Sequence, residues 1–280
     1  AEVYMKSRRD ILKSSRHKKL LEKRKVFAIW GSLILASFFV LVGVLSWFSG
    51  NEKVVIAEIE ARGNSVVSGE EIVSMVREEM AGKYLWLFRK DNSFLYPREM
   101  IKERILSEQK RISEADVYLN NLASLVVSVT ERKPAYLWCG PEYSEEENKK
   151  SCFFMDRDGY IFASAPYFSG DVFFEWYGPT EEKSENPIGD RFLPYTEFKK
   201  LVSFREAISA LGLKTTHLTT RADGDYALAL KDSGSILFNS DQEFDALLGN
   251  LDSAIGALAK YKELEYIDLR FGNKIFYRYK

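Results

Sequence analysis

Histidine is the commonest general base in enzymes, and this sequence offers few histidines that could act as one. It holds two, and only His217 lies beyond the first 25 residues. His217 belongs to the alternating segment Leu213–Thr219, where a lone histidine is more often a surface or hydrogen-bonded residue than a catalytic one. The sequence also lacks the G-x-S-x-G serine turn, the H-E-x-x-H zinc helix and the glycine-rich phosphate loop. We therefore predict no catalytic residue and a protein that is not an enzyme.

The acidic residues and cysteines do not form a metal-site pattern. Asp156-Arg157-Asp158-Gly159 resembles the start of a calcium loop, but the bidentate Glu that completes such a loop is missing, so a hairpin turn is favoured. Two cysteines and two histidines are too few for a zinc finger or an iron–sulfur ferredoxin. The acidic residues leave glycoside hydrolysis open, but no carboxylate pair is singled out. We predict no metal, no cofactor and no small-molecule substrate.

The distribution of charge and hydrophobicity indicates a membrane protein. The first 25 residues carry ten Lys/Arg against three Asp/Glu, whereas the rest of the chain carries 30 basic and 38 acidic residues. Val26 to Phe48 is 23 residues long and has no charge, enough for a helix across about 30 Å of hydrocarbon. A cleaved signal peptide is the alternative, but its apolar part spans only about 7–15 residues and ends in small residues, whereas Trp47 and Phe48 are bulky.

Basic segments stay on the cytoplasmic side of a membrane, so we expect residues 1–25 to be a cytoplasmic tail and 26–48 a transmembrane helix. The rest would lie outside the cytoplasm. The tail could also contact anionic lipid or nucleic acid, but its topological role is sufficient, and a basic arm is not a nucleic-acid-binding domain. A length of 280 residues predicts two folded units. The sequence begins with Ala1, and Met5 is a candidate start residue.

Residues 54–133 predict the order strand, helix, helix, strand, strand. Val54–Ala61 alternates as a strand does, Ser68 to Glu71 is a capping box that opens a helix, and Pro97 occupies a typical first helical position. Two strands follow, with a turn at Asn120-Asn121. The expected inward-facing residues are Ile72, Met75, Val76 and Met80 on the first helix, and Ala115, Val117, Leu119, Leu125, Val127 and Val129 on the strands.

Residues 134–280 predict an antiparallel sheet with helices packed on it. One helix is expected at Thr196–Leu211, and a second opens at the capping box Ser240 to Glu243. The expected strand pairs are 226–230 with 236–238 and 265–271 with 274–279, each joined by a turn that contains glycine. The first helix should bury Phe198, Leu201, Ile208 and Leu211, and the second Phe244, Leu247, Leu248, Leu251, Ile255 and Leu258.

This order of elements, with IEARGNSVVSGEEI at its start and VVSVTERKPAYLW at its end, resembles the POTRA domain of the FtsQ/DivIB family of single-pass cell-division proteins. FMDRDGYIF and LEYIDLRFGNKIFYRY resemble two hairpins of the family's second domain, so the resemblance covers residues 26–280. The acidic insertion Tyr143–Lys150 and the irregular stretch 178–195 depart from the family pattern. The implied fold is α+β: a transmembrane helix, a β-α-α-β-β POTRA domain at 54–133 and an FtsQ-type antiparallel β domain with packed helices at 134–280.

The resemblance implies a non-enzymatic scaffold of the divisome, located at the septum in the bacterial inner membrane. Such a scaffold would bind FtsB/DivIC-like and FtsL-like single-pass proteins, with no nucleic acid, and help to control septal wall synthesis. An extracytoplasmic sensor or cell-wall-binding module is the alternative, and a membrane-anchored hydrolase comes third. Neighbouring wall-precursor or FtsZ-like genes would favour division, whereas a neighbouring regulator would favour sensing.

The last hairpin is the expected partner site, because the family's second domain binds its partner at this end by strand addition. The sequence adds its own reason. A two-residue turn at Gly272-Asn273 would pair Leu269 with Phe276, whereas a three-residue turn would flip the last strand and expose Phe276. Either register leaves a large apolar side chain on a charged face, beside an open strand edge unless neighbouring segments cover it. The candidate residues are Tyr266, Lys274, Ile275, Phe276, Tyr277, Arg278 and Tyr279.

Cys139 and Cys152 flank the acidic insertion and could face each other at the base of a hairpin. A disulfide is permitted outside the cytoplasm, and closing a loop of about 14 residues adds roughly 3 kcal/mol of stability. Two buried free thiols are the alternative.

Two stretches, Tyr84–Phe88 and Asp171–Tyr177, gather large aromatic side chains. Core packing is the expected role of both. The alternative is an exposed patch that meets a partner or the membrane surface.

Overall fold

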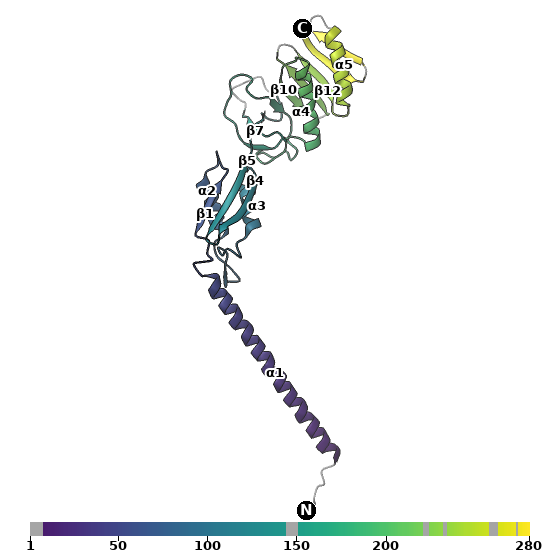
Figure 1. The fold of residues 1–280 in the computed structure, drawn as a ribbon. Helices are drawn as coiled ribbons and strands as arrows, with labels where there is room; N and C mark the ends of the chain where they lie inside the picture. Colours follow the sequence, from purple (N-terminus) through teal and green to yellow (C-terminus); the bar gives the residue numbers. More distant parts are fainter. Residues whose placement is uncertain (1–7, 144–150, 221–223, 232–233, 258–262, 273) are drawn as a thin grey trace, which may run out of the picture. The chain divides into compact units, whose positions relative to one another are not determined.

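The computed structural model describes residues 8–143, 151–220, 224–231, 234–257, 263–272 and 274–280 (Figure 1). Most of the acidic insertion, residues 144–150, therefore lies outside the described residues. The chain forms two compact units. One comprises Ala1–Arg62, Gly69–Glu103 and Asp116–Ser128, and the other Gly63–Ser68, Arg104–Ala115 and Val129–Lys280. The expected domain boundary at residue 133 stays a prediction.

A single long helix, α1 (Arg8–Ser49), begins the described chain. Its part Glu22–Ser49 is long and apolar enough to cross a membrane, with a mean hydropathy of 2.4 in its most apolar window. None of that window is buried within the protein, as expected for side chains that face lipid. The chain is therefore consistent with a single-pass membrane protein, and α1 is the one such helix among the described residues.

A three-stranded sheet with strand order β1-β5-β4 follows α1 in the sequence. β1 (Glu58–Arg62) runs parallel to β5 (Ser124–Glu131), and β4 (Ile112–Asn121) completes the sheet. Helices α2 (Gly69–Glu79) and α3 (Arg98–Glu108) lie between β1 and β4 in the sequence, as predicted. The predicted stripe of α2 is buried, because its apolar residues recur at helical spacing. The structure adds a small hairpin of β2 (Lys83–Tyr84) and β3 (Phe88–Arg89) between the two helices.

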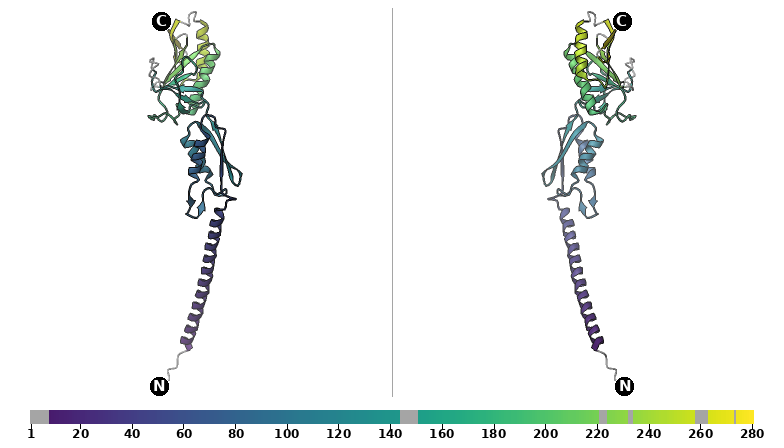
Figure 2. Two further views of the ribbon diagram at one scale, coloured as in Figure 1. Left: turned by 90° about the vertical axis from the view of Figure 1, so that its left-hand side faces the viewer. Right: turned by 90° about the vertical axis from the view of Figure 1, so that its right-hand side faces the viewer.

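The second unit contains a nine-stranded sheet with strand order β14-β13-β12-β11-β10-β9-β6-β7-β8. Helices α4 and α5 lie on the same side of this sheet (Figure 2). The strands and helices are β6 (Tyr136–Trp138), β7 (Phe153–Met155), β8 (Ile161–Ser164), β9 (Glu175–Tyr177), α4 (Tyr195–Ala210), β10 (Thr215–Thr220), β11 (Asp225–Leu230), β12 (Ser235–Asn239), α5 (Phe244–Ala257), β13 (Leu264–Phe271) and β14 (Lys274–Tyr279).

The expected fully antiparallel sheet is wrong in three places. β12 and β13 are parallel, and so are β9 and β10 and also β6 and β9. The first two pairs each enclose a helix, α5 and α4 respectively. A strand that returns after a helical crossover enters the sheet in its original direction, which gives a parallel pair.

One apolar core lies between α4, α5 and the sheet, with Trp176, Phe198 and Phe238 fully buried. The predicted face of α4 is correct for Phe198, Leu201 and Ile208 but wrong for Leu211, which follows the end of the helix and is exposed. The opposite sheet face carries mostly small and polar residues on β10, β11 and β12, as is usual where one face of a sheet is solvated.

Candidate partner-binding edge

β14 ends the nine-stranded sheet, and among the described strands its only neighbour is β13. Gly272, at a φ of 67°, provides the left-handed residue of the turn between them. The Lys280 N–H donates to the Glu263 carbonyl, at 2.9 Å. Because backbone groups alternate along a strand, the N–H and C=O groups of Tyr277 and Tyr279 point away from β13. These groups are positioned to pair with an additional strand.

The hairpin register combines the two predicted alternatives. Phe271 pairs with Lys274 across a two-residue turn, but the pairing then shifts by one residue, so that Asp268 lies opposite Phe276. A shift of this kind is a β-bulge. As a result, Ile275 packs against the core, whereas Phe276 lies on the face opposite the helices.

The hairpin exposes four large side chains. Phe271 is 57% exposed, Phe276 50%, Tyr277 52% and Tyr279 39%. The rings of Phe271 and Phe276 pack edge to face with centroids 5.2 Å apart, and those of Tyr277 and Tyr279 lie 5.5 Å apart. Alternation along β14 places Phe276 on one face of the strand and the two tyrosines on the other. A strand added at this edge would therefore meet aromatic rings on both of its faces.

Two basic side chains lie among these rings. Lys274 is exposed, and Arg278 pairs with Glu265, with Nη2 and Oε1 2.6 Å apart. The Arg278 guanidinium also lies 5.7 Å from the centre of the Tyr266 ring. Of the seven candidate residues, Tyr266 and Ile275 are half-buried, and the other five are exposed on β14.

A network of ion pairs connects β13 to the strands behind it. The carboxylate of Asp268, which is buried, accepts hydrogen bonds from Nε and Nη2 of Arg270, at 2.9 and 2.7 Å. Arg270 also pairs with Asp225 of β11, whose Oδ1 accepts a hydrogen bond from Asn239 of β12, at 3.0 Å. Burial raises the pKa of Asp268, but the hydrogen bonds from Arg270 outweigh it and hold that pKa below its usual range. The network holds β11, β12 and β13 together behind the edge strand.

This network was not predicted from the sequence. Asp268 and Arg270 are two residues apart, which places both on one face of a strand, and this spacing is the one local signal of the network. Asp225 lies about 45 residues away along the chain and could not be assigned to them without the strand order.

His217 lies on β10 and is packed among aromatic rings. Its ring stacks on that of Tyr143, with centroids 4.2 Å apart and planes at 7°, and meets the edge of Tyr177. Its Nδ1 lies 3.2 Å from the hydroxyl of Thr216. His217 is therefore a half-buried residue of a strand, in contact with several neighbouring side chains.

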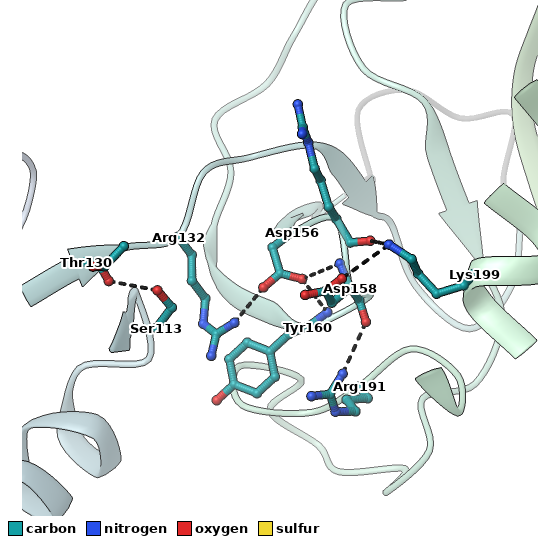
Figure 3. A network of polar contacts seen from close by, with 9 residues as sticks. Ser113, Thr130, Arg132, Asp156, Asp158, Tyr160, Arg191 and Lys199 are labelled. Atoms are coloured by element: carbon teal, nitrogen blue, oxygen red, sulfur yellow. Dashed lines mark hydrogen bonds and ion pairs between the residues drawn. The ribbon is translucent and has the colours of Figure 1, made fainter. Parts of the chain in front are cut away.

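The Asp156–Gly159 segment forms a turn between β7 and β8, as expected (Figure 3). Oδ1 of Asp156 accepts hydrogen bonds from the N–H groups of Asp158 and Tyr160, at 2.9 and 3.0 Å, while Oδ2 pairs with Arg132 at 2.6 Å. The Arg132 guanidinium also lies 4.0 Å from the centre of the Tyr160 ring. Both oxygens of Asp156 are therefore occupied by the turn and by Arg132, which is a structural arrangement.

Cys139 and Cys152 are joined by a disulfide at the base of the acidic insertion. The two aromatic stretches differ in their surroundings. Phe174, Trp176 and Tyr177 are buried, so the stretch Asp171–Tyr177 belongs mostly to the core. In contrast, Leu85 and Trp86 are exposed.

The chain fits no protein-family model, and no curated protein matches its sequence. Within the described residues, no group of three or more His, Cys, Asp or Glu side chains could hold a metal ion. The open edge at β14, with its exposed rings, is therefore the strongest candidate site on this part of the chain.

Proposed function

We propose that this protein is a non-enzymatic, single-pass scaffold of bacterial cell division, similar in organisation to the FtsQ/DivIB family. The observation that carries the proposal is the open edge of β14, where backbone groups of Tyr277 and Tyr279 point outward between exposed aromatic rings. An edge of this kind suits binding by strand addition. The partners are other single-pass division proteins, of the FtsB/DivIC and FtsL types.

In this proposal α1 anchors the protein in the inner membrane, with the basic tail in the cytoplasm and everything after about Asn51 outside. Ten basic residues before the apolar segment favour this orientation. Protease added to spheroplasts should digest the folded units and leave the tail protected inside the cell. A C-terminus that resists protease until the membrane is lysed would refute the orientation.

The scaffold would act by holding its partners at the septum, where they help to control wall synthesis. A strand added to β14 would pair with the outward groups of Tyr277 and Tyr279, while its side chains pack on the rings of Phe276 and Tyr277. The ion-pair network of Arg270 contributes by keeping β13, on which β14 rests, in place. No chemical step is required of any side chain.

Crosslinking in living cells tests the proposal. A photoreactive amino acid in place of Tyr277 should crosslink to a single-pass division protein. The matched control is the same replacement of Tyr195, which is about as exposed but lies at the start of α4. Crosslinks to wall polymer at residue 277 would instead support the wall-binding alternative. The same partner captured equally at both positions, or at neither, would overturn the assignment of the edge.

A further inference from the structure

A small hairpin is fastened to the end of the membrane helix. The hydroxyl of Ser46 in α1 donates to the carbonyl of Leu87, at 2.8 Å. Three residues later, the hydroxyl of Ser49 accepts a hydrogen bond from the N–H of Arg89, at 3.0 Å, and its carbonyl accepts one from the side chain of Asn92, at 3.0 Å. Ser49 and Asn92 are both buried. The hairpin of β2 and β3 is therefore held against the last turn of α1.

These bonds fix the depth of the hairpin. Ser46 lies within the charge-free segment, two residues before its end at Phe48, and a helix rises 1.5 Å per residue. At this rise, a helix of the segment's 23 residues is slightly longer than the thickness of the hydrocarbon in a bilayer, roughly 30 Å. If α1 crosses the membrane, Ser46 lies near the boundary between acyl chains and headgroups, and the hairpin bonded to it lies at the same level.

At this level the hairpin exposes apolar side chains. Leu85 is 77% exposed and Trp86 90%, and Phe94, just after the hairpin, is 69% exposed. We call Leu85, Trp86, Leu87 and Phe94 the hairpin patch. Single exposed apolar residues are ordinary on protein surfaces, but several together indicate a surface that another apolar phase covers.

The backbone of the turn is unfavourable for the residues it carries. Leu85 and Trp86 have φ values of 49° and 59°, in the left-handed region of the backbone map. This region favours glycine, because residues with a bulky side chain are strained at positive φ. The turn thus presents a leucine and a tryptophan at a cost in backbone energy. Backbone strain of this kind is found most often at binding and catalytic sites.

An apolar groove continues the hairpin patch onto α1. It has a volume of about 430 Å³ and runs between Leu45 and Phe48 of α1 and Tyr84, Phe88 and Phe94. Lys83 of the hairpin and Lys90, which directly follows it, are basic, whereas the guanidinium of Arg89 is paired with Asp91. Tryptophan and basic side chains together suit the interface of an anionic lipid layer, where rings lie among headgroups and ammonium groups reach phosphates.

We propose that the hairpin patch inserts into the outer leaflet of the membrane beside α1, with an acyl chain in the groove. The occupant is phospholipid because the patch is continuous with the helix that already faces lipid. Insertion would give the protein a second membrane contact beside α1. The inference depends on α1 crossing the membrane and is independent of the proposed role in division.

Depth measurement in lipid tests this directly. Full-length Trp86→Cys protein, with its disulfide intact, would be labelled with a nitroxide and reconstituted without partners into anionic phospholipid nanodiscs. The control is Glu70→Cys, at an exposed position in the first turn of α2. Glu70 lies about 14 Å along the helix axis from Glu79, the last residue of α2 before the hairpin. We expect the label at residue 86 to collide several-fold less with a water-soluble nickel reagent, and more with oxygen, than the label at residue 70.

Equal access of the nickel reagent to both labels would overturn the proposal. Protection of residue 86 that appears only when a division protein is added would also overturn it, because the patch would then meet a partner. If Trp86→Cys does not fold, brominated lipid gives a second test. Quenching of wild-type protein should exceed that of Trp86→Phe protein when bromine lies near the headgroups, and equal quenching would contradict insertion.

Discussion

Asp268 lies opposite Phe276 in the last hairpin, one residue away from the pairing that a regular two-residue turn would give. This shift turns Ile275 toward the core and leaves Phe276 on the solvated face of the edge strand. The buried carboxylate of Asp268 is held by Arg270, so the position of this pair also depends on the network behind it. The burial of Ile275 and the exposure of Phe276 therefore result from one register shift.

Tyr277→Lys should weaken capture of the proposed division partner at least tenfold, equivalent to about 1.4 kcal/mol. The reason is loss of an exposed ring and a new charge at the edge, where lysine disfavours pairing with another strand. The affinity of purified residues 51–280 for the proposed partner checks this. Tyr195→Lys, at a similarly exposed tyrosine on α4, should bind normally. Wild-type affinity of a folded Tyr277→Lys protein would place the site elsewhere.

Arg270→Met should lower the free energy of unfolding by about 2–3 kcal/mol, because it removes the guanidinium that pairs with the buried carboxylate of Asp268 and with Asp225. Arg278→Met is the matched control. Its ion pair with Glu265 lies at the surface, so the expected loss is much smaller than that of Arg270→Met. Urea unfolding measures the loss in free energy of unfolding for each variant. Equal losses would contradict a structural role for the network.

Glu131→Gln should lower the free energy of unfolding by about 1 kcal/mol, because charge-assisted hydrogen bonds are stronger than neutral ones. The Glu131 carboxylate accepts bonds from the N–H groups of Ser65, Val66 and Val67, at 2.6 to 2.9 Å through Oε1. Burial raises the pKa of Glu131, but these backbone bonds outweigh it and lower that pKa below the usual value.

The pH dependence of stability follows from the lowered pKa of Glu131. A carboxyl whose pKa is lowered by folding stabilises the protein above its unfolded pKa, about 4.3 for Glu, and this stabilisation is lost as the pH falls through the folded pKa. The difference between wild type and Glu131→Gln should therefore be constant near neutral pH and shrink in acid. Glu114→Gln, at an exposed position on β4, should change stability by less than about 0.5 kcal/mol. A difference that grows on acidification would contradict the assignment.

Loss of the disulfide should cost about 3 kcal/mol, because the bond closes a loop between residues 13 apart in the sequence. Cys139→Ser with Cys152→Ser should unfold at lower urea than oxidised wild type. Reductant should lower the midpoint of wild type to that of the double variant and leave the double variant unchanged. A wild-type midpoint insensitive to reductant would show that the bond does not stabilise the fold.

Local signals in the sequence located most helices and strands. The capping box and helical spacing before Met80 place α2 correctly, because both depend on residues within one or two turns. The β2–β3 hairpin could not be predicted, since its strands have two residues each and the connection Leu85-Trp86-Leu87 contains none of the usual turn residues. The role of the seven candidate residues stays a prediction, and their register depends on long-range packing of Ile275 and Asp268.

The direction of the strands in the large sheet also could not be predicted from local sequence patterns. The parallel pairing of β12 with β13 is set by α5 crossing between them, and alternation along a strand carries no information about its neighbour's direction. The depth of the hairpin patch likewise depends on bonds between Ser46 and Leu87, 41 residues apart.

Imaging the full-length protein in dividing cells of its own species tests the central claim most directly. A fluorescent protein fused before the basic tail would remain in the cytoplasm and report the position of the anchor. If the protein is a division scaffold, its fluorescence should form a band at mid-cell that appears with constriction and disappears after the cells separate. An even outline of the cell at every stage, from a fusion that replaces the natural protein, would contradict the proposed function.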